Sequence, residues 1–190
     1  MKVGPKPKIS QEMVLNAAFE VAREQGAEKI FARTVAEKLG CSTQPVMFHF
    51  KTIEELKRAV YRKADAFHAE YVMHITSNEP MRDFGLNFIR FAAEEKNLFR
   101  FLFQSDGIGK ISVTQLLEGA EFEPILNILA DGAGIDAGGA RKVFKSLFLF
   151  VLGYASMLGN NSMIFDEDQI TQDLNMIFKG AVYAVKKENS

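Results

Sequence analysis

Apolar residues recur at helical spacing in the first part of the chain, and capping residues divide them into short segments. Ser10 precedes the first segment and Gly26 follows it, and these residue types are favoured at the N-cap and at the C-terminal end of a helix. The apolar residues between them fall on one helical face: Val14, Ala17, Ala18 and Val21. The pattern predicts a helix from Ser10 to about residue 25.

The stretch from Arg33 to Leu56 predicts two short helices, a tight turn and the start of a third helix. Thr34 and Glu37 have the spacing of a capping box, so we expect the first short helix to begin at Thr34. Gly40 stands where a helix commonly ends in a left-handed residue, a conformation that costs glycine little. We therefore expect the chain to turn at Gly40.

A second short helix is expected to begin at Thr43. Ser42 is a suitable N-cap for this helix, and Pro45 lies in its first turn, where a missing N–H had no intrahelical partner. Thr52 and Glu55 repeat the capping-box spacing, so a longer helix should begin after Thr52. No glycine or proline interrupts the pattern before about residue 76, and we expect this helix to extend that far.

The rest of the chain predicts a larger set of helices. Pro80 marks a helix start, and a short segment begins at Asn97. Smaller helices are expected over residues 112–119 and 122–130. The glycine-rich segment from residue 131 should separate them from two long helices, the first starting after residue 138 or 139 and the second opening at residues 166–168.

No alternating pattern of useful length predicts a strand, so the fold class is all-α, with about nine helices. The helix-turn-helix segment lies at one end of the chain. We expect a helix-turn-helix domain over residues 1–52, including an N-terminal arm over residues 1–9. A helical domain for effector binding and dimerisation should follow over residues 53–190.

Composition indicates a globular protein, because 47% of the 190 residues are apolar. Cys41 is the only cysteine, so no internal disulfide can form and a reducing compartment is expected. We expect no signal peptide, and the longest apolar run, residues 147–152, is far shorter than the ~20 residues of a membrane span. A cytoplasmic protein without a membrane partner is expected.

Basic residues gather near the N-terminus although the net charge is only −1. Residues 1–60 contain ten Lys or Arg and seven Asp or Glu, a net charge of +3, whereas the remaining 130 residues carry −4. Three lysines in the arm supply the excess: Lys2, Lys6 and Lys8. The arm suits contact with DNA, and it is equally explained as a solubilising tail.

The helix-turn-helix segment and its flanking residues, roughly residues 9–60, resemble the DNA-binding domain of the TetR/AcrR family of bacterial transcriptional regulators. Most positions of the family's sequence pattern agree with this chain. The residues at those positions are Thr34, Val35, Ala36, Leu39, Gly40, Cys41, Ser42, Val46, Met47, His49, Phe50, Thr52, Ile53 and Leu56. Met47 replaces the family's usual tyrosine and Ile53 its usual lysine, and both usual residues contact DNA phosphates. This difference implies one of three things: the contacts with the DNA backbone are weaker, the helix-turn-helix domain (the head) has lost DNA binding, or other residues such as Lys51 and Lys57 contact the phosphates. We favour the last of these.

Exposed residues early in the second short helix are expected to read DNA, because this end enters the major groove in a helix-turn-helix. The Gln44 amide can pair with adenine, and Thr43 offers a hydroxyl or a methyl group to base edges, so an A·T-containing half-site is expected. The alternatives are solvated polar positions for these two residues and internal packing for His49. The full set predicted to contact DNA is Arg33, Thr34, Ser42, Thr43, Gln44, Pro45, Met47, Phe48, His49 and Lys51.

The resemblance implies a small-molecule cavity in the second domain, whose occupancy alters the spacing of two heads. Seventeen Phe and eight Met residues suit an apolar or aromatic effector. Phenylalanines at helical spacing are also explained by ordinary core packing. The side chains predicted to line the cavity are Phe84, Phe88, Phe91, Phe99, Phe103, Phe148 and Met157.

The last two helices carry more apolar surface than a small domain readily hides. In the family, the corresponding helices form a four-helix dimer interface, and a homodimer places two heads on symmetric half-sites. The residues predicted at this interface are Phe144, Leu147, Val151, Tyr154, Leu174, Ile177, Phe178 and Ala181.

The sequence offers little for catalysis. Cys41 has no evident base partner, and His68 and His74 are six residues apart, whereas helical metal ligands are usually three or four apart. We read these histidines as packing or surface residues and expect no enzyme activity, catalytic residue, metal or cofactor.

The favoured interpretation is a transcriptional regulator, most simply a repressor. It would bind a pseudo-palindromic double-stranded DNA operator as a homodimer, and a small-molecule effector would release it. The alternative is an all-α protein that binds a small molecule or a partner and whose head does not read DNA.

Overall fold

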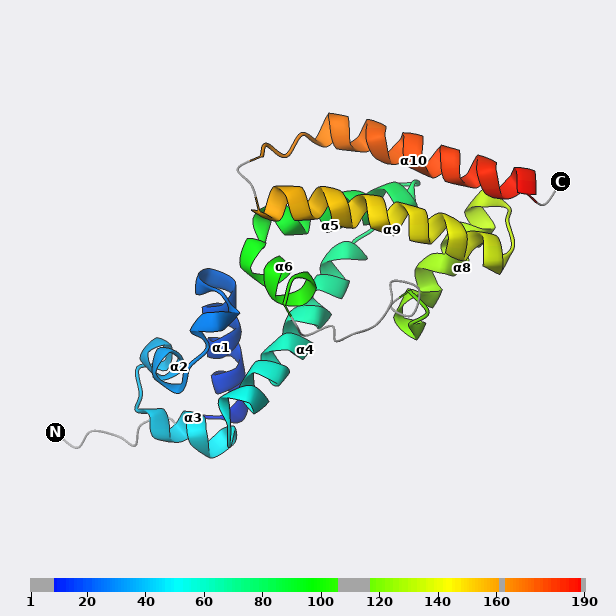
Figure 1. The fold of residues 1–190 in the computed structure, drawn as a ribbon. Coiled ribbons are helices and arrows are strands. Elements are labelled where there is room, and N and C mark those ends of the chain that lie inside the picture. Colours follow the sequence, from blue (N-terminus) through cyan, green and yellow to red (C-terminus); the bar gives the residue numbers. More distant parts are fainter. Residues whose placement is uncertain (1–8, 106–116, 161–162, 189–190) are drawn as a thin grey trace. The chain divides into compact units, whose positions relative to one another are not determined.

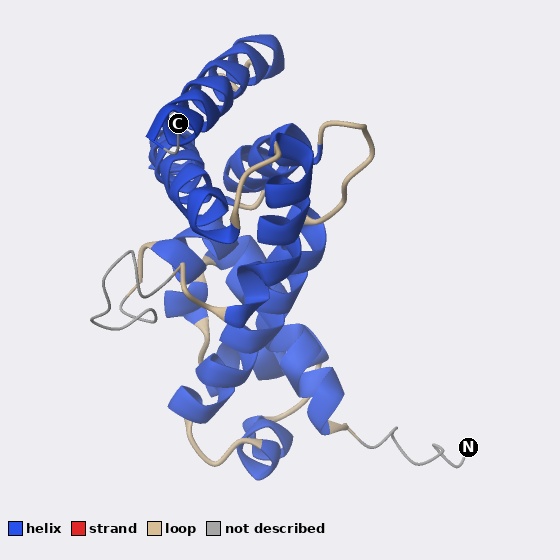
Figure 2. Cartoon of the chain, turned by 90° about the vertical axis from the view of Figure 1, so that its right-hand side faces the viewer, coloured by secondary structure: helices blue, strands red, loops and turns tan. Residues whose placement is uncertain are grey.

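The structure is a computed structural model, and it describes residues 9–105, 117–160 and 163–188. These residues form nine α-helices and two short 3-10 segments, joined by loops and without a strand (Figure 2). The predicted all-α fold class is therefore confirmed. Residues 1–8 of the arm predicted over residues 1–9, and most of the helix expected over residues 112–119, lie outside the described residues.

The helices fall into two compact units. The first comprises residues up to Phe67 together with Asn97–Ser105, and the second comprises the remaining residues. The expected boundary after residue 52 differs from this division, because most of α4 (Ile53–Val72) and nearly all of α6 (Lys96–Phe103) belong to the first unit. Side-chain packing accounts for the difference, since Phe67 of α4 packs edge-on against Phe19, with 5.7 Å between the ring centroids.

The first unit contains three short helices that pack on one another: α1 (Gln11–Gln25), α2 (Ala32–Leu39) and α3 (Thr43–His49). The predicted cap of α1 is confirmed, because the Met13 N–H donates to Ser10 Oγ over 3.2 Å. The side chains that form the core of this unit include Val14, Ala18, Val21, Ile30, Val35, Val46, Phe50, Leu56 and Val60. The apolar face of α1 was therefore predicted correctly.

Helix α2 begins two residues before the predicted start. Phe31 is its N-cap and has an extended backbone (φ −129°, ψ 155°), so Thr34 already lies in the first turn. The predicted capping box is wrong, because the Glu37 carboxylate pairs with Arg33 Nε over 2.9 Å. Alanine and arginine are both good helix formers, which allows the helix to include residues 32 and 33. Arg33 therefore lies within α2 and does not precede it.

The turn after α2 was predicted correctly. Gly40 has a left-handed backbone (φ 63°, ψ 34°), which residues with a Cβ rarely adopt. Its N–H donates to the Glu37 carbonyl over 3.1 Å, and the Cys41 N–H donates to the Ala36 carbonyl over 3.0 Å. These two bonds form a Schellman motif, which satisfies carbonyl groups at the end of the helix.

Helix α4 begins after Thr52, as predicted. Thr52 Oγ1 accepts from the Glu55 N–H over 3.1 Å, and the Glu55 carboxylate accepts from the Lys51 N–H over 2.9 Å. The helix ends at Val72, about four residues before the predicted end. The α6 segment returns to this unit, where the Phe101 ring packs edge-on against Tyr61 of α4.

The second unit is built around α5 (Pro80–Glu94) and α9 (Ala137–Asn160). Helices α8 (Glu123–Ala133) and α10 (Glu167–Glu188) pack against α9 (Figure 1). Gly85 permits a close approach of α5 to α10, because a Cβ there would lie 2.9 Å from a methyl carbon of Leu174. The phenylalanine rings in the core of this unit are Phe84, Phe88, Phe91, Phe144 and Phe148.

The loop that joins α8 to α9 is shorter than the glycine-rich segment predicted to separate them. Residues 131–133 form the end of α8 and residues 137–140 already belong to α9, so only residues 134–136 join the two helices. The predicted start of α9 after residue 138 or 139 is therefore wrong. The residue that caps the start of α9 is Asp136 and not a glycine. Its side chain accepts from the Gly139 N–H over 2.6 Å.

Helix α9 is the one described helix that is long and apolar enough to cross a membrane. Of its most apolar 18-residue window, 44% is buried within the protein. Its neighbours are α5, α8 and α10. A helix that packs on three others in this way is expected to have a high content of apolar residues.

Candidate functional site

Helix α3 turns one face to the core of the first unit and another face to solvent. Val46 is fully buried, whereas Thr43 and Gln44 at the N-terminal end of the helix are exposed. Met47 is 39% exposed and Phe48 is 77% exposed. The exposed face of α3 therefore combines two polar side chains, which can form hydrogen bonds, with two apolar ones.

The other residues predicted to contact DNA lie on α2 or beside α3. Arg33 is highly exposed, although it pairs with Glu37 one turn along α2. Of the rest, Ser42 and Lys51 are exposed, and Thr34 and Pro45 are half-buried. Ser42 occupies the predicted N-cap position of α3, although its side chain makes no capping hydrogen bond, and Pro45 lies in the first turn. A local group of accessible side chains thus surrounds the N-terminal end of α3.

His49 is held by the main chain of the same unit. Its Nε2 lies 2.9 Å from the carbonyl oxygen of Ile9, to which the ring donates when the proton is on that nitrogen. The ring also packs edge-on against Phe48, with 5.1 Å between centroids. This contact holds Ile9, the last residue of the predicted arm, and the sequence did not predict this role for His49.

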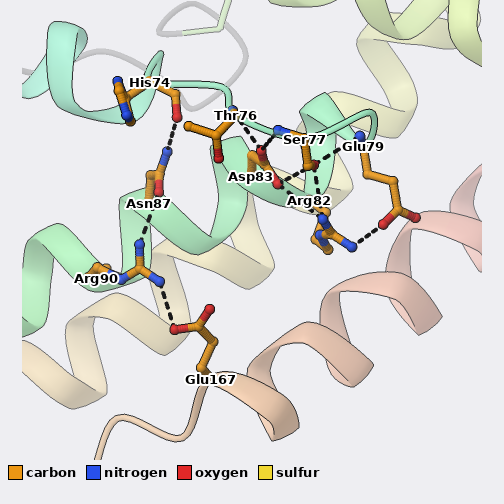
Figure 3. A network of polar contacts seen from close by, with 9 residues as sticks. All are labelled: His74, Thr76, Ser77, Glu79, Arg82, Asp83, Asn87, Arg90 and Glu167. Atoms are coloured by element: carbon orange, nitrogen blue, oxygen red, sulfur yellow. Dashed lines mark hydrogen bonds and ion pairs between the residues drawn. The ribbon is translucent and has the colours of Figure 1, made fainter.

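A polar network in the second unit holds the segment between α4 and α5 (Figure 3). The Asp83 carboxylate is 7% exposed and accepts from the Thr76 N–H (3.0 Å), the Ser77 N–H (2.7 Å) and the Ser77 hydroxyl (2.7 Å). Burial by itself would raise the pKa of Asp83, but these hydrogen bonds outweigh burial and lower the pKa below its usual value. Asp83 is therefore ionised at neutral pH.

Arg82 extends this network toward the N-terminal end of α5. It pairs with Glu79 and donates to Ser77 Oγ over 2.9 Å, and its Nη2 lies 3.4 Å from the Asp83 carboxylate (Figure 3). Arg82 is thus surrounded by acceptors from its own unit.

The network continues along α5 to α10. Asn87 donates to the carbonyl oxygen of His74 over 2.9 Å. Arg90 pairs with Glu167 of α10 over 2.7 Å (Figure 3). Its guanidinium also lies 5.6 Å from the centroid of the Phe165 ring. These contacts join the segment before α5 to the first turn of α10.

A pocket of about 190 Å³ lies in the second unit, among α8, α9, α10 and the N-terminal end of α5. Its most buried lining residues are Met81, Leu129, Leu147 and Leu174, each at most 6% exposed. Its polar lining residues are Asn78, Glu79, Arg82 and Asn175. The remaining ones are Pro80, Ile128, Gly132, Ala133 and Phe178. Most lining residues of the pocket are thus apolar, and its most buried side chains are all apolar.

The seven residues predicted to line a ligand cavity do not line this pocket. Phe84, Phe88, Phe91 and Phe148 are buried in the core of the second unit. The Phe88 and Phe148 rings, for example, pack edge-on with 5.8 Å between centroids. Phe99 and Phe103 belong to the first unit, and Met157 is 52% exposed on α9. The helical spacing of the phenylalanines therefore reflects core packing.

The residues predicted at a dimer interface are largely buried within the single chain. Leu147, Leu174 and Phe178 line the pocket. Of the others, Phe144 and Val151 are buried, and Tyr154, Ile177 and Ala181 are half-buried. More exposed apolar side chains on the same two helices are Met157 (52%), Met176 (66%) and Tyr183 (69%). Half of the predicted interface residues are thus buried within the single chain, and the other half are partly accessible.

The two histidines of the α4 region have different environments. The His68 ring is 8% exposed and packs edge-on against Phe88 and Phe91, at 5.0 and 4.8 Å between centroids. Burial lowers the pKa of His68 to about 4, so the ring is neutral at neutral pH. The His74 side chain is exposed. One histidine packs and the other lies at the surface, as the sequence indicated.

Within the described ranges, no three His, Cys, Asp or Glu side chains gather in a way that would hold a metal ion. Comparison of the sequence with protein-family models finds no match, and comparison with curated proteins finds none. The function must therefore be inferred from the residues and from their arrangement.

Proposed function

We propose that the protein is a DNA-binding transcriptional regulator of the TetR/AcrR type, most simply a repressor. It binds a pseudo-palindromic operator as a homodimer in the cytoplasm, and a small molecule releases it. The observation that carries this proposal is the arrangement of α2 and α3 around the left-handed Gly40. Val46 anchors α3 while Thr43 and Gln44 at its N-terminal end remain exposed. A helix presented in this way suits the major groove.

The charge around α3 supports the approach of DNA. No acidic residue occurs between Glu37 and Glu54, so the phosphates would meet little like-charge repulsion at α3. Lys51 is exposed directly after α3 and can neutralise a phosphate. Lys51 would thus take over the phosphate contact that the resemblance assigns to the positions of Met47 and Ile53.

The last two helices support self-association. Met157 of α9 and Met176 and Tyr183 of α10 are each more than half exposed. Gly180 lies between the latter two along α10, and a Cβ there would meet no atom within 4 Å. An exposed apolar surface with space for close helix packing suits a second copy of the chain. Two copies would add the binding free energies of two heads.

Footprinting tests the proposal. Genomic fragments should first be selected with the full-length protein at low ionic strength and then treated with a cleavage reagent. We expect two protected half-sites whose centres are separated by about one helical turn, roughly 10 base pairs, or by a multiple of it. The control is the Thr43→Ala/Gln44→Ala double variant, which should fold normally and lose sequence preference. Absence of protected bases on every fragment would contradict the proposal.

The second candidate function is an all-α protein that binds a partner or a small molecule without reading DNA. The 77% exposure of Phe48, together with Met47, favours this candidate, because a protein partner would also bury these apolar side chains. The same footprinting experiment separates the two candidates.

A further inference from the structure

We propose that the pocket at the N-terminal end of α5 binds a neutral, compact and largely apolar small molecule that carries one hydrogen-bonding group. That this molecule acts as the effector rests on the proposed function, whereas its binding does not. The site differs from the cavity predicted from the phenylalanine pattern, since none of those seven residues lines it.

The inner part of the pocket determines the apolar portion of the ligand. Met81, Leu129 and Leu174 come from three different helices and are at most 6% exposed, yet they border about 190 Å³ of space. The pocket is partly open to solvent, so an apolar ligand would displace water from these apolar side chains, which is favourable. A cavity of about 150 Å³ lined by similar side chains accommodates benzene. One aromatic ring or a short branched alkyl group therefore matches the space.

The charged residues of the pocket argue against an anionic ligand. Glu79 and Arg82 are the charged lining residues, and they pair with each other. Arg82 also donates to Ser77 and lies near the ionised Asp83, so its guanidinium is already surrounded by acceptors (Figure 3). A ligand carboxylate would be repelled by Glu79 and would find the Arg82 guanidinium already paired with acceptors of the protein.

A cationic group would gain little in the same place. The Glu79 side chain is 56% exposed and already paired, and exposed ion pairs contribute little to binding. The amide side chains of Asn78 and Asn175, in contrast, each contain a donor and an acceptor. They suit the hydroxyl or amide group of a neutral molecule. The two asparagines thus favour a neutral hydrogen-bonding group on the ligand over a charged one.

Gly132 provides a way to obstruct the pocket without disturbing the fold. It lines the pocket from the last turn of α8, and a Cβ at this position would have no atom within 4 Å. Leucine in its place would occupy open space and would also favour the helix, because leucine has a higher helix propensity than glycine. The substitution Gly132→Leu should therefore reduce ligand binding and leave the protein folded.

The test measures binding of three matched probes to the full-length protein by fluorine NMR: 4-fluorobenzyl alcohol, 4-fluorobenzylamine and 4-fluorobenzoate. We expect saturable binding of the alcohol, and about tenfold weaker or no binding of the benzoate. Gly132→Leu should weaken binding of the alcohol by about tenfold or more. The control Asn127→Leu adds the same side chain at an exposed position of α8 that does not line the pocket, and should leave binding unchanged.

The proposal is overturned if no probe binds, if the benzoate or the amine binds better than the alcohol, or if Gly132→Leu and Asn127→Leu have equal effects. These measurements use no DNA, so their outcome is independent of footprinting. Binding of the alcohol without any footprint would contradict the proposed function and leave the ligand site supported. A footprint without probe binding would support the proposed function and overturn the ligand site.

Discussion

Folding keeps His68 uncharged, because its ring is buried against Phe88 and Phe91 and its pKa falls to about 4. In the unfolded chain the pKa of a histidine returns to about 6.5. As the pH falls from about 6.5 toward 4, the unfolded state therefore binds a proton that the folded state does not bind. The contribution of His68 to the free energy of unfolding is complete above about pH 6.5 and decreases below it.

We predict that this effect removes about 3 kcal/mol of stability between roughly pH 6.5 and 4. Urea denaturation of the natural protein and of His68→Leu at several pH values in this window measures the effect, and the variant should lose less stability as the pH falls. His74→Leu is the matched control, because the His74 side chain is exposed. Equal pH dependence of the natural protein and His68→Leu would refute the assignment.

At the level of single helices, the proposed function assigns different roles to the exposed N-terminal end of α3 and to the lysine that follows this helix. In the proposed function Gln44 would contact base edges and Lys51 would contact the DNA backbone, and both residues are exposed. Base contacts determine sequence preference, and phosphate contacts contribute affinity that depends on salt concentration. The two substitutions should therefore have different signatures.

We predict that Gln44→Ala lowers discrimination between the operator and a site with one altered base pair by about 1–3 kcal/mol. Lys51→Ala should weaken binding to all sequences alike and reduce the slope of log affinity against log salt concentration by about one. Fluorescence anisotropy over a range of salt concentrations measures both effects. If the two variants weaken every sequence equally and change the slope equally, the roles assigned to Gln44 and Lys51 are wrong.

For the whole molecule, the proposed function requires a dimer, and the exposed side chains of α10 provide its test. Met176 and Tyr183 are 66% and 69% exposed, so substitutions there should leave the fold of a single chain intact. We predict that Met176→Glu/Tyr183→Glu shifts the protein from dimer to monomer, because burying two carboxylates in an apolar interface is unfavourable.

Light scattering after size-exclusion chromatography measures this shift, and circular dichroism verifies the fold. The control Asn127→Glu adds a carboxylate at an exposed position of α8, which is not one of the two helices that carry the exposed methionines and Tyr183. A double variant that has the mass of the natural protein at the same concentration would exclude this face as the interface.

The sequence predicted local features of the helices well and their partners in space poorly. The cap of α1 at Ser10, the turn at Gly40 and the start of α4 after Thr52 all agree with the structure. The capping box at Thr34 failed, because residues 32 and 33 also favour a helix and the Glu37 side chain pairs with Arg33. Two local interactions competed there, and sequence spacing alone did not rank them.

The all-α class, the approximate positions of most helices and several of their ends follow from interactions among residues only a few positions apart, so the order of the amino acids was sufficient to determine them. Whether a phenylalanine fills a core or borders a pocket depends on helices that are distant in the sequence. Phe88 packs against Phe148, and Met81 borders the same space as Leu129 and Leu174. The tertiary structure alone decided these neighbours, because helical periodicity identifies an inward face without identifying what lies opposite it.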